Sequence, residues 1–231
     1  MHDLPTVSCR PLCDGDDRPS LRSHAGVVFF LGERADAEAA ARQLFGRRLT
    51  SWEYAGLAGA PDDALVEVGT LGEALYIELT GPPDQGYRAF YLVRQYQWSP
   101  VIVTDAFHIL RRHQQRRGLG LRVLKRQLDH AHRLHVSRIE LVAGRRSREN
   151  GYYTWPRFGF DGPLPSLPNC ELPGNLRHAR SVLDLMECES GRQWWKEHGV
   201  PMPVAFDVAR HSRSWEVFRR YVRERNTVGA G

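Results

Sequence analysis

Apolar and polar residues alternate between positions 64 and 110, which is the pattern of half-buried β-strands. Four stretches with a two-residue period follow one another there, separated by short turns rich in glycine and proline; they are residues 64–71, 74–81, 87–96 and 100–110. Short turns of this kind join neighbouring antiparallel strands. The pattern therefore predicts an antiparallel meander.

Other elements precede and follow this meander. An apolar stretch at residues 26–32 predicts a buried strand, and helical segments are predicted at 35–45 and 50–59. A further helix follows the meander, because apolar residues recur there at helical spacing; they are Leu121, Leu124, Leu128 and Ala131.

A short apolar strand at residues 138–144 follows that helix. A helix of about fifteen residues between two strands is the crossover that parallel pairing requires. Strands 100–110 and 138–143 are therefore predicted to be parallel within an otherwise antiparallel sheet. The predicted fold class is α/β, with a mixed, mostly antiparallel sheet flanked by helices.

The sequence suggests three regions. Residues 1–24 are rich in Pro, Asp and Arg without periodicity and predict an N-terminal extension, whereas residues 25–162 form the predicted main domain. Residues 163–231 begin with a proline-rich linker and predict a C-terminal helical extension that packs on the core. Two helices are expected in it, at 181–199 and 214–225.

Composition narrows the class of protein. The 231 residues carry a formal net charge of +5, and only Lys125 and Lys196 among the 32 basic residues are lysines. Arginine is the better bidentate partner for phosphate, so this composition fits an anionic ligand or a nucleic acid, although a GC-rich coding bias fits it equally well. The cysteines form no C-x-x-C pair, and no metal site is predicted.

The chain shows no membrane or secretion signal. No stretch approaches the roughly 20 apolar residues that a membrane-spanning helix needs. The N-terminal residues also lack the basic-then-apolar order of a signal peptide. The sequence therefore predicts a cytoplasmic protein without a membrane partner.

Gly118 and Gly120 lie between the last strand of the meander and the following helix. Glycine allows close backbone approach or a positive φ, and the first N–H groups of a helix, at the positive end of its dipole, bind anions. This context favours a phosphate site formed by the amides of residues 116–121, with Arg116 and Arg117 adding positive charge. The alternative is a glycine turn that serves only to pack the helix against the sheet.

Residues 115–120 read Gln-Arg-Arg-Gly-Leu-Gly and match the pattern [RQ]-x-x-G-x-[GA]. A Walker loop does not fit because no G-K-[ST] follows, and the third glycine of a dinucleotide fingerprint would be Val123. The six residues resemble motif A of the GNAT superfamily of acyl-CoA-dependent N-acyltransferases. The order of the surrounding strands and helices, up to Gly159-Phe160, is also similar to that family, so the resemblance covers about residues 26–162.

The resemblance implies the acyl-CoA N-acyltransferase fold, in which two parallel strands splay apart and admit the pantetheine arm of the cosubstrate. The implied cosubstrate is acetyl-CoA, whose pyrophosphate would rest on the motif amides. The strand end at Ile109 and Leu110 would pair with pantetheine and supply the N–H that polarises the thioester carbonyl. Together with this pair, the implied cofactor-binding residues are Gln115, Arg116, Arg117, Gly118, Leu119, Gly120, Leu121 and Asn150.

The implied activity is acetyl transfer to a primary amine of unidentified origin, by direct attack on the thioester. The family's usual acid is a tyrosine four residues before the Gly of Gly-Phe, and this chain has Trp155 at that position. An indole cannot serve as the acid. Tyr152 or Tyr153, in the same short predicted helix, would then replace it, and the spacing of Asn150 also departs from the family pattern.

Candidates for the base lie in the strand before the motif. Strand alternation predicts Asp105 on the face of Val103, Phe107 and Ile109, where apolar neighbours would raise the pKa of its carboxyl. His108 is predicted on the other face, with Thr104 and Ala106. Glu78 is a third candidate, and a chain of water molecules could also replace a base.

Other functions remain open at this point. The arginines, including those of the final predicted helix, favour a nucleic-acid-binding or aminoacyl-tRNA-modifying protein as the second choice. A non-catalytic acyl-CoA sensor is a third, because Trp155 occupies the acid position. A homodimer that pairs edge strands and a monomer whose C-terminal helices cover those edges fit the sequence equally well.

Overall fold

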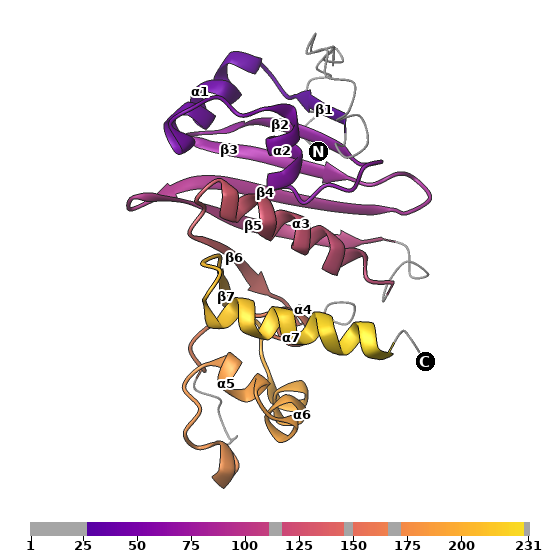
Figure 1. Cartoon of the computed structure of the whole chain (residues 1–231), viewed down its shortest axis with the longest axis vertical. Helices are drawn as coiled ribbons and strands as arrows, with labels where there is room; N and C mark the ends of the chain where they lie inside the picture. Colours follow the sequence, from indigo (N-terminus) through magenta and orange to yellow (C-terminus); the bar gives the residue numbers. More distant parts are fainter. Residues whose placement is uncertain (1–26, 111–116, 146–149, 166–171, 229–231) are drawn as a thin grey trace, which may run out of the picture. The chain divides into compact units, whose positions relative to one another are not determined.

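The computed structural model describes residues 27–110, 117–145, 150–165 and 172–228 (Figure 1). Its contacts group the chain into two compact units, unit 1 up to Ser137 and unit 2 from Arg138. The sequence placed residues 138–162 with the preceding strands, so the two divisions differ in that segment. The N-terminal extension predicted at residues 1–24 lies outside the described residues.

Unit 1 alternates strands and helices in the predicted order. Its elements are β1 (Val27–Phe30), α1 (Arg34–Phe45), α2 (Ser51–Leu57), β2 (Leu65–Leu71), β3 (Ala74–Thr80), β4 (Tyr87–Tyr96), β5 (Ser99–Ile109) and α3 (Leu119–Arg133). Each of them was expected from the sequence at these positions. Hydrophobic patterning, helix propensity and capping residues therefore located these elements.

Strands β2 to β5 form the predicted antiparallel meander. Each strand pairs with the next along the chain, and Ile77 of β3 lies opposite both Val68 of β2 and Tyr91 of β4. Alternation brings apolar side chains from all of these strands to one face of the sheet. Ile77 and Val68 on that face are 0% exposed, so it forms the core of unit 1.

Unit 1 contains a parallel strand pair that was not predicted from the sequence. β1 pairs in parallel with β2, with Val28 opposite Val66. Helices α1 and α2 lie between these strands in the chain and form the crossover that parallel pairing requires. The parallel pairing expected between strands 100–110 and 138–143 involves both units and stays a prediction.

Helix α3 has the predicted apolar stripe. Leu124, Leu128 and Ala131 are at most 3% exposed, and Leu121 is half-buried. In Figure 1, α2 and α3 lie side by side over the strands of unit 1. The buried side-chain amide of Gln127 in α3 donates a hydrogen bond to the Leu57 carbonyl of α2 (2.8 Å), which fixes the position of α3.

Unit 2 contains two paired strands and several short helices. Its elements are β6 (Arg138–Ala143), α4 (Gly151–Arg157), the 3-10 helix η2 (Gly174–Leu176), α5 (Val182–Met186), α6 (Glu189–His198), β7 (Met202–Asp207) and α7 (Arg213–Val228). β6 and β7 are antiparallel, with Leu141 opposite Val204. Among the described strands, β7 pairs with β6 alone.

The structure of the C-terminal region differs in two respects from the helices predicted there. The prediction missed β7, because Pro203 lies inside this strand and proline lacks the N–H that a central strand needs. An edge strand tolerates that loss. The helix expected at 181–199 is also divided in two, because the backbone of Cys188 is extended (φ −122°, ψ 158°) and starts α6 anew.

Aromatic side chains dominate the core of unit 2. Phe206 of β7 makes edge-to-face contacts with Phe160 (ring centroids 5.5 Å apart) and with Trp215 of α7 (5.7 Å). Trp195 of α6 is 0% exposed and donates its indole N–H to the Tyr152 carbonyl (2.8 Å). Helices α4, α6 and α7 are thus held by large rings.

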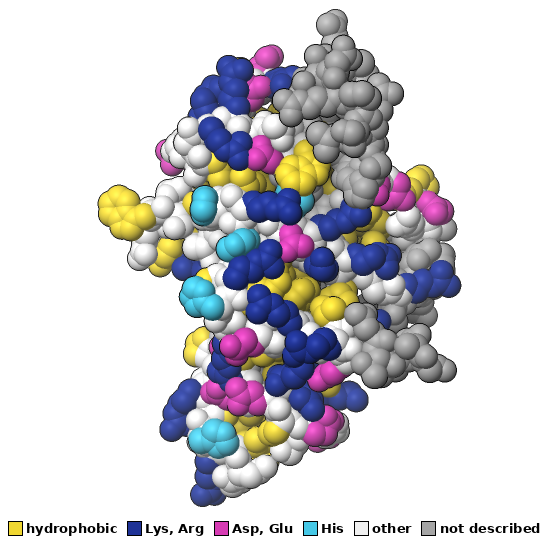
Figure 2. All heavy atoms as spheres, in the orientation of Figure 1, with side chains coloured by type: hydrophobic (Ala, Val, Ile, Leu, Met, Phe, Trp, Pro, Cys, Tyr) yellow, Lys and Arg dark blue, Asp and Glu magenta, His cyan; other side chains and the backbone are white. Residues whose placement is uncertain are grey.

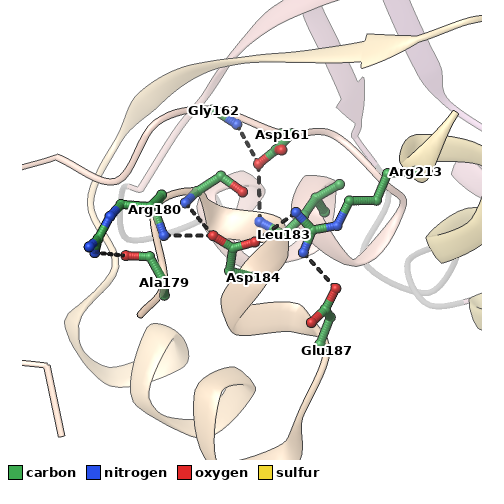
Figure 3. Close-up of polar contacts among 9 residues, drawn as sticks. Asp161, Gly162, Ala179, Arg180, Leu183, Asp184, Glu187 and Arg213 are labelled. Atoms are coloured by element: carbon green, nitrogen blue, oxygen red, sulfur yellow. Dashed lines mark hydrogen bonds and ion pairs between the residues drawn. The ribbon is translucent and has the colours of Figure 1, made fainter. Parts of the chain in front are cut away.

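A polar network fixes α5 within this unit (Figure 3). One carboxylate oxygen of Asp184 accepts from the backbone N–H groups of Arg180 (2.6 Å) and Ser181 (2.8 Å), just before the helix. Its other oxygen pairs with the Arg213 guanidinium at 2.7 Å, and Arg213 also reaches Glu187 at 2.7 Å. Asp184 therefore caps α5 and ties it to the start of α7.

The predicted fold class is confirmed. The chain is α/β, and its strands form a mixed, mostly antiparallel arrangement flanked by helices. In the part of the chain that the structure describes, no helix is long and apolar enough to cross a membrane.

Candidate functional site

Helix α3 begins at a glycine whose backbone is left-handed. Gly118 is the N-cap with φ 78° and ψ 5°, a conformation that side-chain-bearing residues rarely adopt. The first hydrogen bond of the helix runs from the Arg122 N–H to the Gly118 carbonyl (3.0 Å). The N–H groups of residues 119–121 precede it and have no acceptor within the helix.

No negative group of the described residues occupies this helix start. Gly118 provides no capping side chain, and the first turn contains no acidic residue. Arg117 and Arg122 are exposed there, and the Arg122 guanidinium donates to the Arg117 carbonyl (3.2 Å). Amides without an acceptor in the helix, the positive end of the helix dipole and two guanidiniums all favour a bound anion.

The outer side of α3 extends this basic character. Arg122, Lys125 and Arg133 are exposed along the helix, and Asp129 pairs with Lys125 at 3.4 Å. Figure 2 shows Lys and Arg side chains with an acidic one among them over the position of α3. Since this charge is mixed and solvent-exposed, the helix start remains the most specific anion-binding feature of unit 1.

The two glycines have different roles. A Cβ at Gly120 would lie 3.5 Å from the Phe107 ring, an ordinary packing distance, so this position packs the helix on the sheet and tolerates alanine. A Cβ at Gly118 would meet only the tip of Arg122 at 3.7 Å, but the positive φ there disfavours any side chain. The phosphate-site interpretation therefore depends on Gly118, and the packing interpretation describes Gly120.

The end of β5 distinguishes the two residues expected to contact pantetheine. The Leu110 N–H donates to the Gly86 carbonyl at 2.7 Å, so it points toward β4 and already has an acceptor. Backbone groups of successive strand residues point to opposite sides. The N–H of Ile109 therefore points away from β4.

A β-bulge interrupts β5 at Asp105. Phe90 of β4 lies opposite Ala106, whereas the next residue, Tyr91, lies opposite Thr104, which leaves Asp105 as the extra residue. A bulge of this kind changes the side to which the following residues point. The simple two-residue period used for the sequence prediction therefore fails beyond this position.

Because of this bulge, the prediction that His108 shares a face with Thr104 is wrong, whereas its predicted shared face with Ala106 is confirmed. Phe107 shares the core face with Thr104, because their partners on β4 are Ala89 and Tyr91. His108 lies on the opposite face, as the partner of Arg88, and is exposed. Asp105 is also exposed and lacks the apolar surroundings that the sequence predicted.

Glu78 has more structured surroundings, on the same face as His108. It is 6% exposed, forms an ion pair with Arg88, and accepts a hydrogen bond from the Tyr76 hydroxyl (3.0 Å). Glu67 lies directly opposite Glu78 on β2. Burial first, and then the charge of Glu78, raises the pKa of the Glu67 carboxyl.

A carboxyl with a raised pKa is a better general base near neutral pH, so Glu67 is a candidate that the sequence prediction missed. A charged residue in the middle of an apolar strand was the available signal. It occurs in Val66-Glu67-Val68 and again in Ile77-Glu78-Leu79.

The tyrosines proposed as acids lie in α4 of unit 2 and differ in their partners. The Tyr152 hydroxyl donates to the Lys196 carbonyl at 2.8 Å. The Tyr153 hydroxyl has no hydrogen-bond partner within the described residues, and its ring lies 5.5 Å from the Arg157 guanidinium carbon. Of the two hydroxyls, that of Tyr153 is therefore the one that no described residue engages.

Two other residues of interest also belong to unit 2. Asn150 is the exposed N-cap of α4, and its carbonyl accepts from the backbone N–H groups of Tyr153 and Thr154 (both 3.0 Å). Trp155, at the family's acid position, packs edge-to-face on Phe160 with ring centroids 5.1 Å apart. Its role within the described residues is therefore in packing.

The candidate residues are divided between the two units. The start of α3 and the end of β5 belong to unit 1, together with Asp105 and His108, whereas the two tyrosines and Asn150 belong to unit 2. Gln115 and Arg116 lie outside the described residues. Within those residues, no group of three or more His, Cys, Asp or Glu side chains could hold a metal ion.

No protein-family model matches the chain, and no curated protein matches it.

Proposed function

We propose that this protein is an acyl-CoA-dependent N-acyltransferase that moves an acetyl group from acetyl-CoA to a primary amine. One observation carries the proposal: the left-handed Gly118 opens α3 directly after the meander, and neither a capping side chain nor a first-turn acid competes for the amides there. The resemblance of residues 115–120 to motif A of the GNAT superfamily supports it.

The start of α3 would hold the diphosphate. The amides of Leu119, Gly120 and Leu121 are the donors, the helix dipole adds a fixed positive charge, and Arg117 adds a mobile one. The described residues fit this group because nothing negative has to be displaced from the first turn. Binding at this site requires main-chain geometry, not a particular side chain.

The strand end and the nearby carboxylates would serve the reaction. Acetyl-CoA supplies an activated thioester carbonyl, and the amine displaces the thiolate. By the resemblance, a backbone N–H at the end of β5 would stabilise the developing oxyanion. For the base we favour Glu67 over the exposed Asp105 and His108, because its pKa is raised.

Calorimetric titration with coenzyme A tests the proposal, using a matched pair of variants at one position. Gly120→Glu brings a carboxylate to the diphosphate and is expected to weaken binding about a hundredfold or more, since like charges at close range cost several kcal/mol. Gly120→Ala adds a methyl group without charge, in ordinary contact with Phe107, and should bind like the wild type.

Two results would contradict the proposal. One is a wild-type protein that binds no coenzyme A, and the other is equal binding by both variants. A thiol-release screen with acetyl-CoA and a panel of amines, from amino acids and polyamines to peptides and charged tRNA, then identifies the acceptor. Release must depend on the added amine.

A non-catalytic acyl-CoA sensor is the second candidate. Trp155 favours it, because the indole packs on Phe160 and cannot protonate a thiolate. The sensor would bind acetyl-CoA and release no thiol with any amine. Nucleic-acid binding is less favoured, since Arg219 of α7 donates to the carbonyl of Arg210 (2.9 Å) within unit 2.

A further inference from the structure

A small pocket in unit 2 is lined by three arginines from three helices. Arg157 ends α4, Arg192 lies in α6, and Arg220 lies in α7. The other lining residues are Met186, Val217, Tyr221 and Glu224. The pocket is small and open to solvent. We refer to it as the arginine pocket.

A helix-terminal carbonyl positions two of the guanidiniums. Met186 is the last residue of α5, and its carbonyl accepts from Arg192 (2.9 Å) and from Arg220 (3.3 Å). Such carbonyls have no partner within their own helix, so the two arginines satisfy a group that needs donors. The acceptor is neutral, however, and it leaves the positive charge of Arg220 uncompensated.

Arg157 is held by aromatic rings. Its guanidinium carbon lies 5.0 Å from the Tyr221 ring centroid and 5.5 Å from that of Tyr153. Contacts of this kind fix the plane of the guanidinium while they leave its N–H groups unused. Within the described residues, Arg157 makes no hydrogen bond and no ion pair with a carboxylate.

The charges around the pocket do not balance. Arg192 pairs with Glu189 at 2.7 Å, but the Glu189 side chain is 82% exposed. Arg157 and Arg220 are half-buried and have no carboxylate partner among the described residues. Glu224 lines the pocket without a hydrogen bond to either of them. A bound anion would compensate the two unpaired guanidiniums and use their remaining donors.

We propose that the arginine pocket binds the phosphate group of a small ligand. Guanidinium groups match phosphate oxygens with paired N–H donors, and three helices present them from different directions. The pocket is small and open to solvent. A phosphate group at its mouth, with the rest of the ligand extending into solvent, suits this shape.

Calorimetric titration of the full chain with inorganic phosphate, in phosphate-free buffer of low ionic strength, tests this site. The wild type should show saturable binding. Arg157→Gln should weaken it about tenfold or more, since a hydrogen bond to a charged group contributes that much. Arg223→Gln is the matched control, because Arg223 is an exposed residue of the same helix as Arg220 and does not line the pocket.

Two further variants make the result specific. Arg220→Gln should weaken binding as Arg157→Gln does, and it replaces that variant if circular dichroism shows that Arg157→Gln does not fold. Gly120→Glu should leave this phosphate binding intact, because it alters only the start of α3. Failure of coenzyme A binding in Gly120→Glu together with retained phosphate binding therefore separates the two proposals.

The source of the phosphate is distinguished by a second titrant, a single-stranded oligonucleotide without terminal phosphates. The small-ligand proposal predicts that inorganic phosphate binds. It also predicts that any binding of the oligonucleotide is the same in the wild type and in Arg157→Gln. Oligonucleotide binding that requires Arg157, without binding of inorganic phosphate, would assign the pocket to a nucleic-acid backbone and overturn the proposal. No binding of phosphate, or equal weakening by Arg157→Gln and Arg223→Gln, would also overturn it.

Discussion

Two regions of the molecule are suited to anions, and they are built from different chemical groups. The start of α3 in unit 1 offers main-chain N–H groups beside Gly118, from consecutive residues. The arginine pocket in unit 2 offers the guanidiniums of Arg157, Arg192 and Arg220, which are far apart in the chain. A backbone site of this kind can be recognised in a short stretch of sequence. A pocket of converging side chains can be recognised only in the folded structure.

The two regions should therefore respond differently to mutation. A site made of amides is sensitive to backbone conformation and to added charge, and it is insensitive to the loss of a side chain. A site made of guanidiniums loses affinity with each arginine removed. The following variants test this difference from the largest expected effect to the smallest.

Gly118→Val should have the largest effect. A β-branched residue at φ 78° is strained by about 1–3 kcal/mol, and relief of that strain would distort the helix start. We expect a loss of that size in the free energy of unfolding, measured with urea, together with lost coenzyme A binding. Phosphate binding in the arginine pocket should persist.

Gly118→Asn is the matched control, because asparagine tolerates the left-handed region. The free energy of unfolding of this variant should fall by less than about 1 kcal/mol, because asparagine tolerates this conformation. If the valine and asparagine variants were equally stable and bound coenzyme A equally, the backbone interpretation of Gly118 would be wrong.

Asp184→Ala should have an intermediate effect, confined to unit 2. Loss of a helix cap costs about 0.5–2 kcal/mol, and the ion pair with Arg213 is lost with it. We expect weaker phosphate binding in the arginine pocket, whose lining includes the end of α5, and unchanged coenzyme A binding. Urea unfolding followed by tryptophan fluorescence measures the stability, since most of the tryptophans lie in unit 2.

This effect should depend on pH in a defined direction. Burial alone would raise the pKa of the Asp184 carboxyl, but the N–H groups of Arg180 and Ser181 and the Arg213 guanidinium hold that pKa below its usual value. A lowered pKa contributes stability above the unfolded value of about 3.9, and the contribution is lost as the pH falls through the folded pKa. The difference in the free energy of unfolding between the wild type and Asp184→Ala should thus be constant near neutral pH and shrink below about pH 4. A difference that grows on acidification would contradict this assignment.

Glu224→Gln should have the smallest effect, and in the opposite direction. It removes the single carboxylate among the residues that line the pocket, so phosphate should bind about twofold to fivefold more tightly, the range for one partly exposed charge. Calorimetry with inorganic phosphate measures the change, and Glu216→Gln, an exposed glutamate earlier in α7, is the control. Equal gains in both variants would indicate a general effect of net charge.

Much of unit 1 follows from local sequence patterns. The two-residue period placed β2 to β5, and the apolar stripe placed the buried side of α3, because both signals arise from neighbouring residues. The bulge at Asp105 could not be found in this way, since an extra residue in one strand appears only against its partner. The prediction that His108 shares a face with Thr104 was wrong for that reason alone.

In unit 2, local sequence patterns predicted less of the structure. β7 contains Pro203, which argues against a strand unless its edge position is known. The arginine pocket combines α4, α5, α6 and α7, so no spacing in the sequence indicates it. By contrast, the phosphate interpretation of residues 116–121 needed only glycines ahead of a helix, and Gly118 has the left-handed backbone that it requires.

Amide chemical shifts at the start of α3 report most directly on whether main-chain N–H groups hold a diphosphate. Proton–nitrogen correlation spectra of the labelled protein, titrated with coenzyme A, should show their largest changes at Leu119, Gly120 and Leu121, with the same saturation as the calorimetric binding. Saturating coenzyme A that leaves these three amides unshifted would contradict the account.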